Sequence, residues 1–174
     1  MFLSIFLFEL KYQFRRPVTY IFWGILFAVG AFTASLLGGA FDIPVFIGGD
    51  KVFVNSPFFI NMILVNVSMF FMILYIPILG RAVERDFQFG FHPLLFTTPI
   101  TKFSYLFGRL SAAMIVNTVV LTGLGIGMLL ANQMPWLNEL RMGPFIFMGY
   151  VQPYLTHILP NRFFIGSILS LIHI

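Results

Sequence analysis

The stretch Arg81–Arg109, RAVERDFQFGFHPLLFTTPITKFSYLFGR, separates two strongly apolar parts of the chain. Its charged residues lie near the two ends: Arg81, Glu84, Arg85, Asp86, Lys102 and Arg109. Between them, a short apolar patch leads into a Thr-Thr-Pro sequence: Leu94, Leu95, Phe96, Thr97, Thr98 and Pro99. An apolar patch of helical size between charged ends is typical of a segment that docks into a groove of a partner protein. The alternative is a patch that rests on a membrane surface with its charges solvated.

The composition of the whole chain indicates a membrane protein. Of the 174 residues, 59% are hydrophobic and 9% are charged, and the mean hydropathy is +0.95. A soluble domain has about 45–50% apolar and about 25% charged residues. The net charge of +4 is scattered between apolar runs, which favours membrane topology over nucleic-acid binding as its explanation. The chain has no cysteine, so thiol nucleophiles and thiolate metal sites are excluded.

The apolar runs on both sides of Arg81–Arg109 predict an all-α membrane protein with three full transmembrane helices and a truncated fourth. A helix needs about 20 predominantly apolar residues to cross a bilayer. The predicted spans are residues 18–37, 57–79 and 105–130, and a fourth begins at 163–168. The segment 132–160 is interrupted by prolines, and we predict that it is interfacial or re-entrant on the far side of the membrane.

Two groups of residues inside the predicted spans allow more than one interpretation. In the second span, polar side chains are interpreted as bonding to neighbouring helices, with a polar translocation path as the alternative: Asn61, Asn66 and Ser68. In the third span, three alternate glycines superficially resemble a dinucleotide loop: Gly123, Gly125 and Gly127. Because no strand precedes them, they predict close helix packing instead.

The first 16 residues predict an interfacial helix that lies along the membrane. Its basic residues follow the apolar part and would be held at the head groups: Lys11, Arg15 and Arg16. A secretory signal would place basic residues ahead of the apolar part, whereas an interfacial helix accommodates this order. Pro17 then lets the chain turn into the bilayer. A frayed apolar terminus is the alternative.

The distribution of lysine and arginine predicts the orientation. With the N-terminus and the loop 81–104 in the cytosol, that side holds Lys11, Arg15, Arg16, Arg81, Arg85, Lys102 and Arg109. The opposite side holds Lys51, Arg141 and Arg162. Seven against three obeys the positive-inside rule, so the prediction is a multi-pass protein with a cytosolic N-terminus.

The last six residues, Leu169–Ile174, resemble the translation of an adapter used in preparing sequencing libraries. We therefore expect the natural chain to continue past Ile168. An apolar helix containing the same six residues by chance is the alternative.

Several short motifs occur in an order that resembles the type-2 ABC exporter permeases. They are Arg15-Arg16-Pro17, Thr19-Tyr20-Ile21, Asn55-Ser56-Pro57, Arg85-Asp86-Phe87, Leu94 to Ile100, Tyr105 to Arg109, Met134 to Leu137 and Leu159-Pro160-Asn161. More closely, the chain is similar to a bacterial subgroup sometimes fused to a gluzincin aminopeptidase. The resemblance covers residues 1–168, which would form the N-terminal part of a permease transmembrane domain.

The resemblance implies that the chain is a permease subunit that couples a cytosolic ATPase to substrate export. The loop 81–104 would carry the coupling helix, and its partner-binding residues would be Arg85, Asp86, Leu94, Leu95, Phe96, Thr97, Thr98 and Pro99. ATP and Mg²⁺ would bind on the separate ATPase subunit, and this chain would hold no cofactor or metal. A homodimer or a paired permease in the bacterial cytoplasmic (inner) membrane is expected on the same ground.

Enzymatic activity is the competing class. The chain contains neither a Gly-x-x-x-x-Gly-Lys-Ser/Thr loop nor a His-Glu-x-x-His motif, so the sequence predicts no catalytic residue. His92 and His157 are predicted on opposite sides of the membrane and would not share a metal. Two alternatives stay open. The chain could be the membrane domain of a zinc aminopeptidase whose catalytic part lies outside this sequence, or a non-transporting membrane anchor subunit.

Overall fold

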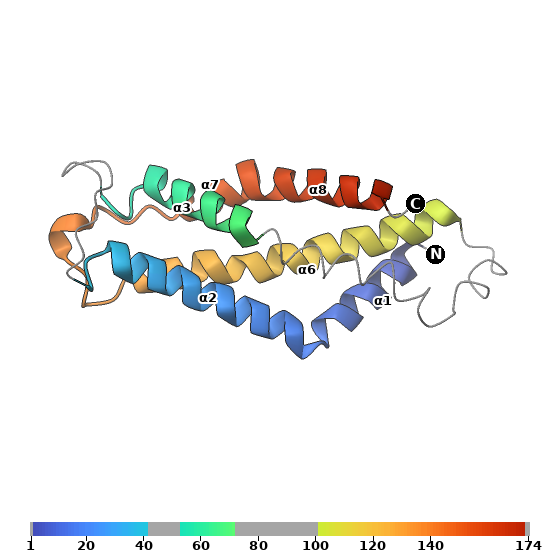
Figure 1. Ribbon diagram of the computed structural model, residues 1–174, viewed down its shortest axis with the longest axis horizontal. Coiled ribbons are helices and arrows are strands. Elements are labelled where there is room, and N and C mark those ends of the chain that lie inside the picture. Colours follow the sequence, from blue (N-terminus) through green and yellow to red (C-terminus); the bar gives the residue numbers. More distant parts are fainter. Residues whose placement is uncertain (1, 42–52, 72–100, 173–174) are drawn as a thin grey trace.

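The longest helix, α6 (Lys102–Ala131), is the axis along which the other helices are arranged (Figure 1). The computed structural model describes residues 2–41, 53–71 and 101–172, and within these ranges it contains helices and no strand. The prediction of an all-α protein is therefore confirmed for the described residues. Thr101 caps the start of α6, since its hydroxyl accepts a hydrogen bond from the backbone N–H of Ser104 at 3.3 Å.

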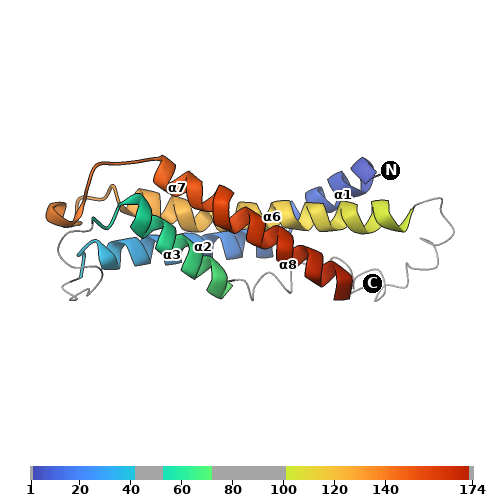
Figure 2. The ribbon, with the colours of Figure 1, turned by 90° about the horizontal axis from the view of Figure 1, so that it is seen from above.

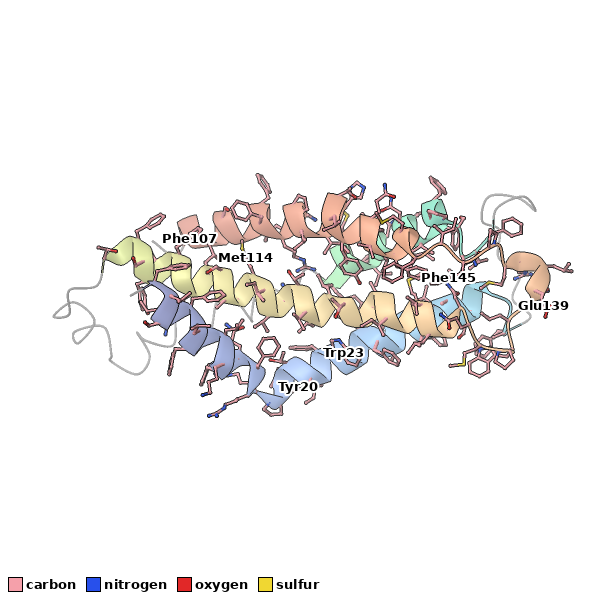
Figure 3. The ribbon with its side chains drawn as sticks, turned by 180° about the vertical axis from the view of Figure 1, so that it is seen from behind. Tyr20, Trp23, Phe107, Met114, Glu139 and Phe145 are labelled. Carbon is pink, nitrogen blue, oxygen red and sulfur yellow. The ribbon has the colours of Figure 1, made fainter. Side chains whose placement is uncertain are left out.

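Two helices, α1 (Phe2–Phe14) and α2 (Pro17–Leu37), lie along one side of α6 and meet at a sharp corner (Figure 1). The corner forms because Arg16 is extended, with ψ 128°, and Pro17 opens α2, a position that suits its fixed φ. Tyr20 lies near this corner, partway along the length of α6, and Glu139 lies at one end of the molecule (Figure 3). Helix α2 ends where Gly39 takes a φ of 89°, which favours glycine because it has no Cβ.

Helices α2 and α6 are in backbone-to-backbone contact through glycines. A Cβ on Gly30 would overlap the carbonyl oxygen of Leu124, and one on Gly127 would overlap that of Phe27. A Cβ on Gly123 would lie 2.6 Å from the carbonyl oxygen of Trp23. The prediction that the alternate glycines serve close helix packing is confirmed.

The opposite side of α6 is covered by α3 (Pro57–Phe70) and by a helix that runs from Met148 to Ile172 (Figures 1 and 2). The latter consists of α7 (Met148–Pro153), a π-helical turn, η3 (Tyr154–Ile158), and α8 (Leu159–Ile172). The sequence predicts an interfacial segment over 132–160 and a span from 163, so the observed helix starts 15 residues earlier than expected (163 − 148). The π turn lies between Pro153 and Pro160 and interrupts the α-helical bonding there.

The segment from Asn132 to Phe147 links the two sides at the far end of α6. It contains the short 3-10 helix η2 (Glu139–Arg141), whose start is capped by the side chain of Asn138. Asn55, just before α3, is joined to Gly143 by two hydrogen bonds of 2.7 Å, one donated by each residue. These contacts hold the start of α3 against the linking segment.

Among the residues that the structure describes, two helices are long and apolar enough to cross a membrane, Pro17–Leu37 and Phe103–Ala131. They correspond to the first and third predicted spans. The second predicted span, 57–79, is described as far as Phe71, and the 14-residue helix α3 forms most of that described part; residues 72–79 lie outside the described part. The core between the two sides of α6 is formed by Leu26, Ala34, Phe59, Ile60, Ile63, Leu64, Val116, Val120, Leu121, Leu124 and Met128.

Candidate functional site

The residues predicted to bind a partner lie outside the described ranges: Arg85, Asp86, Leu94, Leu95, Phe96, Thr97, Thr98 and Pro99. On either side of these residues, the structure describes the chain up to Phe71 and again from Thr101. On one side α3 is followed to Phe71, and on the other the cap residue Thr101 leads directly into α6. The first turns of α6 are therefore the part of the structure to which this loop is most directly attached.

Helix α1 lies along these first turns of α6 (Figure 1). The Phe2 and Phe107 rings are 5.9 Å apart between centroids. At Gly108, a Cβ would lie 3.3 Å from the Ile5 side chain, so the absence of a side chain there allows the two helices to approach closely. The contact joins the loop-proximal end of α6 to the N-terminal helix.

A buried ion pair crosses this contact. The Glu9 carboxylate lies 3.6 Å from the Nε of Arg109, and the two side chains are 2% and 7% exposed. The Gln13 amide donates a hydrogen bond of 3.1 Å to the other Glu9 oxygen. The guanidinium of Arg109 lies 4.8 Å from the centroid of the Tyr105 ring, close enough for a cation–π interaction.

The partners of Glu9 explain why a carboxylate is tolerated there. A buried charge is costly unless it is paired and hydrogen-bonded, and Glu9 has both an arginine and an amide donor. We call this set of residues, Glu9, Gln13, Tyr105 and Arg109, the α1–α6 polar cluster. It favours one register of α1 on α6, since sliding either helix would separate the buried charges of Glu9 and Arg109.

Sequence reasoning missed this cluster. It assigned Arg109 to the cytosolic charges and did not single out Glu9 as a buried residue. A signal was present, because Glu9 and Gln13 are four residues apart and share one face of a helix. Lys11 and Arg15 are exposed, as the prediction for an interfacial helix requires, while the face with Glu9 turns toward α6.

Two of the three polar residues of α3, Asn66 and Ser68, bond differently from the prediction. The Asn66 side chain donates to the carbonyl of Met62 at 2.7 Å, and the Ser68 hydroxyl to that of Val65 at 2.8 Å, both within α3. These two side-chain bonds are not made to neighbouring helices. A hydrogen bond between α8 and α3 is made to the backbone of α3: the Arg162 side chain donates to the carbonyl oxygen of Ser68 at 3.3 Å.

Within residues 2–41, 53–71 and 101–172, no three His, Cys, Asp or Glu side chains gather as a metal site would require. Comparisons of the chain with known protein families, with curated proteins and with solved structures found no match.

Proposed function

We propose that this chain is the membrane-spanning permease part of an ATP-driven ABC transporter, with the loop 81–104 as the docking element for a cytosolic ATPase subunit. The proposal rests on the order of the motifs along the sequence and on the way the loop is attached. The loop leads without a break into α6, and the α1–α6 polar cluster ties α1 to the same end of that helix.

Membrane insertion is supported by the apolar surface of α2. Only 22% of its most apolar part is buried, whereas the core helix of a soluble protein is mostly covered. Its exposed side chains include Val18, Tyr20, Ile21, Ile25 and Phe32. A contiguous apolar face of this length is rarely left in water by a monomeric soluble protein, and lipid tails would cover it.

The attachment of the loop suggests how force from an ATPase would reach the membrane. Helix α6 has 30 residues and is therefore about 45 Å long, longer than the ~30 Å hydrocarbon core of a bilayer. A push on the loop would act on the protruding end of α6, and α1 would move with it because breaking the Glu9–Arg109 pair is costly. Movement of both helices would then tilt α2, which packs along the rest of α6.

The remaining features of the proposal follow from the resemblance and from the charge distribution. The chain would lie in the bacterial cytoplasmic membrane with the N-terminus and the loop in the cytosol. It would act as a homodimer or with a second permease, and ATP with Mg²⁺ would bind on the ATPase subunit. The apolar anchors of the docking helix, residues 93–98, would be Leu94, Leu95 and Phe96.

The test is co-purification from the native membrane, with the ATPase identified by its phosphate-binding loop and its ATP hydrolysis. We expect Phe96→Asp to reduce recovery of the ATPase at least tenfold, because it places a charge in an apolar groove, while the chain still inserts in the membrane. Phe89→Asp is the matched control, since it makes the same change in the same loop outside residues 93–98. Equal recovery with wild type and Phe96→Asp would contradict the docking role and leave a membrane anchor as the better account.

A further inference from the structure

The π turn η3 places one tyrosine against the backbone of α6. In this turn the backbone N–H of Leu159 donates to the carbonyl of Tyr154, five residues back, and not four as in an α-helix. The Tyr154 hydroxyl accepts a hydrogen bond from the N–H of Gly125 at 3.0 Å and donates one to the carbonyl oxygen of Leu121 at 2.8 Å.

The two backbone groups that bond to Tyr154 are normally partners of each other. Leu121 and Gly125 are four residues apart, so the N–H of Gly125 and the C=O of Leu121 form one rung of the α-helical ladder. A hydroxyl that bonds to both groups competes with that rung for its donor and its acceptor. Insertion of a side chain into the ladder is one of the recognised causes of a bend in a helix.

The sequence around this rung makes the approach possible. A Cβ on Gly125 would lie 2.6 Å from the Tyr154 oxygen, closer than two such atoms can be. Gly123 and Gly127 lie on either side, so three alternate positions of α6 have no side chain, and glycine in a helix interior costs about 1 kcal/mol relative to alanine. The C-terminal third of α6, which holds these glycines, is therefore intrinsically weaker than the rest of the helix.

We propose that the Tyr154 hydroxyl is a wedge that makes residues 121–125 the bending point of α6, and that the π turn moves this wedge in and out. In one state the hydroxyl is bonded to both backbone groups and α6 bends easily. In the other, the tyrosine withdraws with the π turn, the Leu121–Gly125 bond closes and α6 is stiff. This inference goes beyond the proposed function and does not depend on it, because it concerns the mechanics of two packed helices.

The absence of native cysteines allows a direct measurement with paired spin labels. Phe103→Cys and Leu130→Cys place labels at exposed positions near the two ends of α6, 74% and 42% exposed. A straight helix separates these positions by about 40 Å, at about 1.5 Å per residue. We expect a broad distance distribution for the otherwise native chain in lipid nanodiscs. Adding Tyr154→Phe, which removes only the hydroxyl, is expected to give one narrower peak near 40 Å.

Tyr150→Phe is the matched control. It removes another tyrosine hydroxyl that is hydrogen-bonded to α6, in this case to the Asn132 side chain at 2.7 Å, but one that does not enter the backbone ladder. It should leave the distribution broad. Gly125→Ala, which excludes the Tyr154 ring by volume, should act like Tyr154→Phe.

Hydrogen exchange of the Gly125 amide gives an independent measurement that needs no labels. Closing the Leu121–Gly125 bond in Tyr154→Phe should slow this exchange relative to the native chain. An unchanged label distribution in Tyr154→Phe, or the same change in Tyr150→Phe, would overturn the proposal. So would unchanged or faster exchange at Gly125.

Discussion

At the scale of single residues, the Glu9–Arg109 ion pair connects α1 to the first turns of α6, the part of the described structure nearest the loop 81–104. Replacing only Glu9 with leucine would remove a carboxylate that lies 3.6 Å from the buried Arg109 side chain, and breaking a buried ion pair in this way costs about 3–5 kcal/mol. The double change Glu9→Leu with Arg109→Leu should recover most of that loss, because an apolar pair of similar volume often replaces a buried ion pair at little cost. The free energy of unfolding in mixed detergent micelles, measured by SDS titration with circular dichroism, checks both values.

Lys11→Leu is the control for this prediction, since Lys11 is on the exposed face of the same helix and should change stability by less than about 0.5 kcal/mol. A loss below about 1 kcal/mol for Glu9→Leu, the range of a surface ion pair, would show that the cluster does not fix α1 on α6.

For the same two residues, some features could be predicted from the sequence and others could not. The charge of Arg109 and the helical face shared by Glu9 and Gln13 can be read from the sequence. Their pairing cannot, because Glu9 and Arg109 are 100 residues apart (109 − 9) and only the packing of α1 on α6 brings them together.

At the scale of helices, the contact of α2 with α6 depends on particular glycines. Gly30→Ala would overlap the backbone of α6 and force the two helices apart, whereas nothing lies within 4 Å of a Cβ at Gly24. We therefore expect Gly30→Ala to destabilise the protein by about 1–3 kcal/mol, as overpacking does. Gly24→Ala should be neutral or stabilising by up to about 1 kcal/mol, because alanine favours helix. SDS titration of the two variants measures the difference, and equal effects would contradict the close approach.

Element boundaries show why some helices could be predicted and others could not. The positions of α2 and α6 follow from long apolar runs, and Pro17 marks the start of α2. Helix α6 begins three residues before the predicted span 105–130, because Thr101 caps it. The helix from Met148 to Ile172 was missed because Pro153 and Pro160 normally interrupt a helix. The π turn that lies between them is stabilised by contacts with α6, which no local pattern encodes. The predicted coupling helix, residues 93–98, lies outside the described ranges and stays a prediction.

At the scale of the whole molecule, the described helices form an apolar frame, and the chain resumes after the undescribed residues at Thr101, the start of α6. The segment near Glu139 lies at the opposite end of α6 from the loop attachment (Figures 1 and 3). If the frame crosses a membrane, these two ends face different compartments. Composition alone was sufficient to predict the apolar frame, whereas the partner and the substrate depend on surfaces that composition does not determine.

The most direct test of this account is the sidedness of single cysteines introduced into the cysteine-free chain. Phe96→Cys reports on the loop, and Leu140→Cys reports on the far end, where the native side chain is 88% exposed. With a membrane-impermeant maleimide added to spheroplasts, we expect Leu140→Cys to react and Phe96→Cys to react only after the membrane is permeabilised. Labelling of both positions from the same side would contradict a membrane-crossing frame that holds the loop in the cytosol.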